Sequence, residues 1–162
     1  MTDYGPIDFT FRAIESIAFG IHSILGITEP CTGCLRSAFG DDRGALPTWF
    51  WPLAGLMLMA VALINFSHHD ALILTAQAYI ATFHFGAGFY HVHLGHHPAV
   101  GVAPGVFVVF AFIVTSIRSS IFVAMGGIVV CWLLAWLLAK ILLRSSETRE
   151  GQDLLDRDLR DC

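Results

Sequence analysis

Charged residues are scarce in this sequence, and the scarcity is concentrated in one region. Aspartate, glutamate, lysine and arginine make up 14% of the 162 residues, whereas an ordinary soluble domain is about one-quarter charged. Between Asp70 and Lys140, the only residue of these four types is Arg118. Such a stretch cannot form a water-exposed surface, so the sequence predicts one domain of helices packed in lipid.

Other absences exclude further classes of protein. The sequence has no basic patch, which argues against nucleic-acid binding. Residues 1–16 mix acids with a single arginine, a composition that suits neither a secretory signal nor a transit peptide. Four scattered cysteines give no disulfide framework. No nucleophile and base are placed together, so we do not expect an enzyme acting alone.

Hydrophobic runs predict an all-α integral membrane bundle of five transmembrane helices. The predicted spans are 9–28, 49–67, 71–92, 104–117 and 121–143. Because the fourth run is short, the alternative is four spans with that segment re-entrant. Arg12 lies near the end of the first run, and we expect its side chain to snorkel toward water. The chain then divides into a membrane bundle (1–143) and a charged soluble tail (144–162).

The positive charges predict an orientation for this bundle. Five crossings place the loop at 29–47, the loop at 93–103 and the C-terminal tail on one side of the membrane. That side holds seven of the nine basic residues: Arg36, Arg43, Lys140, Arg144, Arg149, Arg157 and Arg160. By the positive-inside tendency, it faces the cytosol, matrix or stroma. The predicted location is a bacterial inner membrane or an organelle membrane.

Polar residues recur every seven positions in the first and third predicted spans. The two series are Asp8, Glu15, His22 and Glu29, and Asp70, Gln77, His84 and His91. Residues seven apart share nearly one helix face, and a polar face in a membrane points toward protein. With one span between them, the two helices are expected to run in the same direction. Glu15 would then meet Gln77, and His22 would meet His84, at equal depth.

Two interpretations of these pairs remain open. In the first, they are interhelical hydrogen bonds worth of order 1 kcal/mol each. In the second, they form a cofactor-binding site together with His91. His22 and His84 would then be axial ligands of a haem, one histidine would ligate a chlorophyll, or both would hydrogen-bond a quinone. Glu15 would manage protons there, beside Gln77. A small proton or metal transporter lined by the same polar residues is a further alternative.

A second group of candidate ligands lies in the predicted loops. Cys31 and Cys34 form a C-x-x-C pair, and His93, His96 and His97 lie in or beside a loop expected on the same side. Two thiolates and two imidazoles suit tetrahedral zinc, and C-x-x-C is also a redox pair. The alternative is a cysteine-containing turn and a polar histidine loop at headgroup level.

Four features of residues 9–119 occur together. They are a short first helix studded with polar residues, a second entered through Leu46-Pro47, a third ending in GAGFYHVHLGHHP, and a fourth closing with Arg118. In these features the chain resembles the DoxX-like family of small membrane proteins. It departs from the family pattern in its cysteine-bearing first loop and its fifth hydrophobic helix.

The DoxX-like resemblance implies a four-helix membrane bundle. Members include subunits associated with quinone-linked oxidoreductases as well as assembly or chaperone-type proteins. We therefore expect a non-catalytic accessory or assembly subunit of a respiratory or photosynthetic membrane complex. Its expected partners are lipid and other membrane subunits.

Overall fold

The computed structural model describes residues 4–39 and 46–160, and for residues 144–160 it describes the backbone alone. The described part is helical and contains no strand, so the predicted all-α class is confirmed. In chain order, the elements are α1 (Gly5–Thr32), α2 (Cys34–Phe39), α3 (Phe50–Ile64), α4 (Asp70–His93), the 3-10 helix η1 (Pro98–Gly101), α5 (Val102–Arg118) and α6 (Ile121–Arg160).

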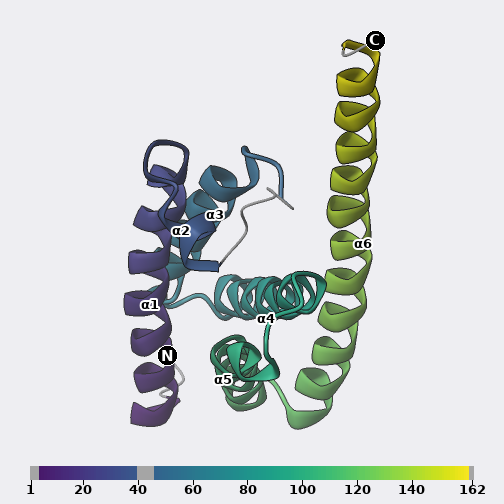
Figure 1. Cartoon of the computed structure of the whole chain (residues 1–162). Coiled ribbons are helices and arrows are strands. Elements are labelled where there is room, and N and C mark those ends of the chain that lie inside the picture. The colour runs from purple at the N-terminus through teal and green to yellow at the C-terminus, as the bar shows by residue number, and fades with distance from the viewer. Residues whose placement is uncertain (1–3, 40–45, 161–162) are drawn as a thin grey trace.

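The helices pack as two groups (Figure 1). α1 packs along α3, with α2 at its C-terminal end, whereas α4 packs against α5 and α6. α1 and α6 run up the page on opposite sides of the molecule, but α4 and α5 are seen nearly along their axes. α4 therefore crosses α1 steeply, and the expectation that the two run in the same direction is wrong. Residues 65–69 turn the chain away from the α1–α3 pair before α4 begins.

Within the described residues, three helical segments are long and apolar enough to cross a membrane. They are α4, the combined stretch Pro98–Arg118 and the first part of α6, Ile121–Leu143. α3 has 15 residues, which span about 22 Å at 1.5 Å per residue, less than the roughly 30 Å of a hydrocarbon core. α1 is long enough but includes several charged residues. The structure thus supports a helical bundle but not the predicted count of five spans.

The first predicted loop is partly helical. α1 continues through Pro30 and ends at Gly33, which has a left-handed backbone with φ of 61°. The carboxylate of Glu29 then accepts the backbone N–H groups of Leu35 (2.6 Å) and Arg36 (3.0 Å). This side chain caps the start of α2, in the way that an acidic residue satisfies the free N–H groups of a helix end. Glu29 therefore has a structural role.

α1 and α3 approach each other through two glycines. A Cβ atom on Gly26 would lie 2.9 Å from the carbonyl oxygen of Trp51. A Cβ atom on Gly55 would lie 2.8 Å from the carbonyl oxygen of Ser23 and 2.8 Å from the backbone nitrogen of Ile27. Close backbone contact through small residues is the usual way in which apolar helices pack in membranes.

The outer faces of both helix groups are apolar. α1 exposes isoleucines, and α6 exposes large apolar residues between Ile121 and Ile141, including Phe122 at 82% exposure. In water, an apolar surface of this extent would drive association. It is consistent with lipid contact around the bundle.

Candidate functional site

A network of buried charges joins α1, α4 and α5 near the N-terminal end of α1. Arg118 donates two parallel hydrogen bonds to the carboxylate of Asp8, each 2.8 Å long, and a third of 2.5 Å to Asp70. Arg12 donates to Asp8 at 2.9 Å and to the backbone carbonyl of Asn65. Arg12 is therefore buried and does not snorkel, because Asp8 supplies its counter-charge inside the protein.

A layer of amide and carboxyl groups follows one turn further along α1. Gln77 donates from Nε2 to Glu15 Oε2 at 2.9 Å, so the predicted pairing of these two residues is present. Asn65 also donates to Glu15 Oε2, at 3.0 Å, and its own side-chain oxygen accepts from Gln77 at 3.1 Å. Asn65 is not among the site residues predicted from the sequence. The available signal was a lone amide at the end of the apolar run WFWPLAGLMLMAVALIN, beside the turn into the next helix.

A cavity of about 430 Å³ begins at Phe19, the next turn of α1. It lies between the two helix groups, with walls from α1, α2, α3, α4, α5 and α6. Its lining is mostly aromatic and aliphatic, and histidines at positions 22, 84 and 91 supply polar groups. This size and this character are typical of sites for small apolar ligands.

His84 is held tightly in the cavity wall. Its ring lies among three phenylalanines, with centroid distances of 5.4 Å to Phe19, 5.4 Å to Phe83 and 4.9 Å to Phe107. Its Nδ1 is 2.8 Å from the carbonyl oxygen of Ile80, one turn back on α4. Packing and this hydrogen bond together fix the direction in which the ring points.

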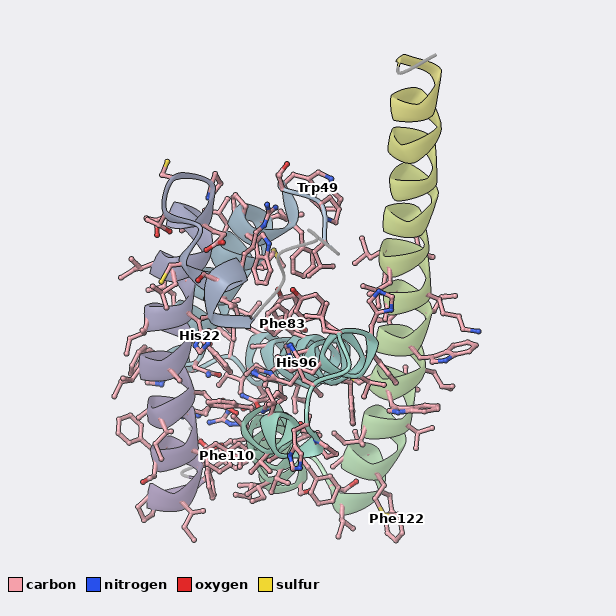
Figure 2. All side chains as sticks on the ribbon, in the orientation of Figure 1. His22, Trp49, Phe83, His96, Phe110 and Phe122 are labelled. Atoms are coloured by element: carbon pink, nitrogen blue, oxygen red, sulfur yellow. The ribbon has the colours of Figure 1, made fainter. Side chains whose placement is uncertain are left out.

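His22 uses the same local arrangement from the other helix group. Its Nδ1 lies 3.2 Å from the carbonyl oxygen of Ala18, and the residue borders the cavity from α1 (Figure 2). The expected hydrogen bond between His22 and His84 is not formed, because each ring binds the backbone of its own helix. Both residues nevertheless line one cavity. The polar stripes thus divide into a buried pair, Glu15 with Gln77, and two cavity histidines.

The remaining predicted ligands lie near the C-terminal ends of α1 and α4. His91 lines the cavity, and its Nδ1 is 2.9 Å from Nδ1 of His96. His97 accepts the backbone N–H of Ala99 at 3.2 Å and so caps η1, while His93 is exposed.

The cysteine pair lies at the junction of α1 and α2. Cys31 and Cys34 are both exposed free thiols. Within residues 4–39 and 46–143, no three histidine, cysteine or acidic side chains are grouped closely enough to hold a metal ion. The zinc site drawn from the C-x-x-C pair and the histidine loop therefore gains no support from the arrangement.

Comparison with known proteins gives no match for this chain, whether with protein-family models, with curated proteins or with solved structures. The DoxX-like resemblance therefore stays a prediction, and the geometry of the cavity is the basis for inferring a function.

Proposed function

We propose that this protein is a membrane protein that binds a quinol, a lipid-soluble molecule with a flat hydroxyl-bearing ring, in the cavity between its two helix groups. The observation that carries the proposal is the hydrogen bonding of the two cavity histidines. A backbone carbonyl can only accept a hydrogen bond, so Nδ1 of His22 and of His84 must each carry the hydrogen. In the neutral rings, Nε2 is then an acceptor available to a ligand.

Because Nε2 of each histidine is a hydrogen-bond acceptor, the cavity favours ligands that carry a hydrogen-bond donor. A quinol hydroxyl can donate to Nε2, whereas an oxidised quinone has only carbonyl oxygens and cannot. The phenylalanines around His84 provide a slot of the kind that a flat ring fills, since offset and edge-to-face contacts between rings are favourable. The apolar remainder of the cavity suits an isoprenoid or alkyl tail.

A haem fits this cavity less well than a quinol. An imidazole with Nδ1 bonded to a carbonyl and Nε2 free is also a good metal ligand. However, haem carries two propionate groups that need cationic or water-exposed partners, and no lysine or arginine lines the cavity among the described residues. Chlorophyll has a far larger ring system than a single-ring quinol. These considerations favour the quinol over the two tetrapyrroles.

The proposal is tested by titrating the protein in nanodiscs with a short-chain benzoquinol while recording tryptophan fluorescence, because Trp51 lines the cavity. We expect quenching that saturates, and we expect His84→Leu to weaken quinol binding roughly tenfold, the effect of about 1.4 kcal/mol. Binding of the matching quinone should change much less, because His84 offers it no hydrogen.

His93→Leu is the matched control for this experiment. It removes an exposed imidazole from the same helix without touching the cavity. Its quinol affinity should equal that of the native protein. If quinol fails to quench, or if His84→Leu binds quinol as tightly as the native protein does, the proposed function is wrong.

A second candidate function, an accessory subunit of a larger membrane complex, is favoured by the shape of α6. This helix continues past its apolar segment to Arg160 and extends well beyond the rest of the molecule (Figure 1). Its last part has the charged sequence RSSETREGQDLLDRDLR, with the leucines as the only apolar residues. A helix of this composition that projects alone from a bundle is suited to contact with a soluble subunit on the cytosol, matrix or stroma side.

The accessory role predicts a large native mass. In mild detergent extracts of native membranes, the full chain should migrate in a particle much larger than its own 17.7 kDa plus a micelle. A chain that ends at Leu143 should leave that particle while keeping the helical circular dichroism of the bundle. Migration of the full chain as a monomer would contradict this role and leave the quinol proposal intact.

A further inference from the structure

Glu15 is the one acid in the α1 network that the neighbouring arginines do not balance. Its side chain is completely buried, with 0% exposure. The two arginines nearby are both committed: Arg118 to Asp8 and Asp70, and Arg12 to Asp8 and a backbone carbonyl. Two positive and two negative groups therefore balance without Glu15. An ionised Glu15 would be an unbalanced charge in the interior, which is among the costliest features that a protein can contain.

The hydrogen bonds around Glu15 are also incomplete in a particular way. Oε2 accepts from both Asn65 and Gln77, but Oε1 has no partner among the described residues. The amide oxygen of Gln77 is likewise buried without a partner there. Both unpaired atoms are acceptors, on two side chains already joined by a hydrogen bond. What the group lacks is a hydrogen.

We propose that Glu15 is a proton-binding site and that it carries its proton in the resting protein. A hydrogen on Oε1 gives the buried carboxyl group a donor, and the amide oxygen of Gln77 is an unpaired acceptor on a side chain already bonded to Glu15, so a cyclic acid–amide pair would satisfy both orphan atoms. The opposite orientation of the Gln77 amide is disfavoured, because its oxygen would then face two acceptors, Glu15 Oε2 and Asn65 Oδ1.

The groups that face Glu15 support a neutral carboxyl group. On its own helix these are Arg12 and Asp8, whose charges oppose each other. From the end of α3 the facing group is the neutral amide of Asn65, and from α4 it is the neutral amide of Gln77. Among the described residues of α5, Arg118 is engaged with Asp8 and Asp70. In the part of the chain that the structure describes, every cation facing Glu15 is already paired with another acid.

The position of the proton gives it a structural role. Glu15, Asn65 and Gln77 connect the two helix groups one turn before the cavity begins at Phe19. Loss of the proton would place a net negative charge at this junction. The site is a property of the ligand-free protein, so it does not depend on the quinol proposal.

The test is an infrared difference spectrum of the native full chain in nanodiscs against Glu15→Gln at neutral pH. We expect the native protein to show the C=O stretch of a protonated carboxylic acid that the variant lacks, and this band should shift to lower frequency in protein prepared in D₂O. Glu15→Gln should keep the native melting temperature, because its amide can donate where the acid did.

Glu29→Gln is the matched control, since both carboxylate oxygens of Glu29 accept backbone N–H groups, so neither is left unpaired as Oε1 of Glu15 is. Its difference spectrum should contain carboxylate bands only. If Glu15→Gln also removes carboxylate bands only, the proposal is overturned.

Should Glu15→Gln fail to fold, the native chain is labelled with ¹³C-glutamate and its four glutamate carboxyl signals are recorded. One signal of the protonated form supports the proposal, and four signals of the ionised form overturn it.

Discussion

Replacing Asp8 by asparagine is expected to destabilise the folded protein by about 3–5 kcal/mol, the usual cost of removing one partner of a buried ion pair. Asp8 is 1% exposed and accepts hydrogen bonds from both Arg12 and Arg118. Without its charge, Arg12 would keep only the backbone carbonyl of Asn65 among its hydrogen-bond partners described here, and Arg118 only Asp70, although the two arginine side chains are 10% and 5% exposed. Asparagine fills the same volume, so lost packing contributes little to the expected effect.

Asp70→Asn is the control for this prediction. Asp70 binds the same arginine, but its side chain is 44% exposed, so water replaces much of what the pair supplies. We expect Asp70→Asn to lower the free energy of unfolding by at most about 1 kcal/mol. Both variants are compared by reversible unfolding with sodium dodecyl sulfate in mixed micelles, monitored by circular dichroism. If Asp8→Asn and Asp70→Asn lowered the free energy of unfolding equally, burial would not determine how much each ion pair stabilises the protein.

Replacing Gly55 by valine is expected to separate α1 from α3. A single added Cβ already lies 2.8 Å from two backbone atoms of α1, and neither atom can move without the whole helix. Overpacking of a well-packed site typically costs about 1–3 kcal/mol, and valine adds two methyl groups beyond the Cβ. We therefore expect Gly55→Val to lower the free energy of unfolding by an amount at or above the upper end of that range. Its melting temperature in the same micelles should also fall.

Gly127→Val is the matched control, because a Cβ at Gly127 meets no atom within 4 Å. The same substitution on α6 should leave stability nearly unchanged, since valine has at least the helix propensity of glycine. If Gly55→Val were as stable as Gly127→Val, the close contact between α1 and α3 would not hold these helices together. Gly55 also lines the cavity, so its variant should bind quinol more weakly.

The spacing of polar residues predicted one contact of the candidate site correctly. Glu15 and Gln77 do form a hydrogen bond, because a buried carboxyl group in an apolar helix must find a donor and few donors exist in such a chain. The same reasoning did not find Asn65. It placed Arg12 at the membrane surface, whereas the structure pairs it with Asp8. Pattern arguments identify which groups need partners, but they do not choose between partners of similar chemistry.

The periodic spacing of His22 and His84 correctly placed both residues at one site, but it did not predict their partners. Both residues do border one cavity, yet they are not bonded to each other, and their helices cross steeply instead of running side by side. The assumption that failed was that two helices separated by one other span run in the same direction. α4 instead packs mainly against α5 and α6.

The sequence by itself determined that this chain is helical and apolar, and that its few buried polar groups must pair. These properties follow from composition and from the energetic cost of unpaired polar groups in an apolar environment. Only the tertiary structure decided which helices are neighbours and that a cavity lies between two helix groups. Those features depend on close steric contacts, such as that between Gly26 and Gly55, which side-chain periodicity does not record.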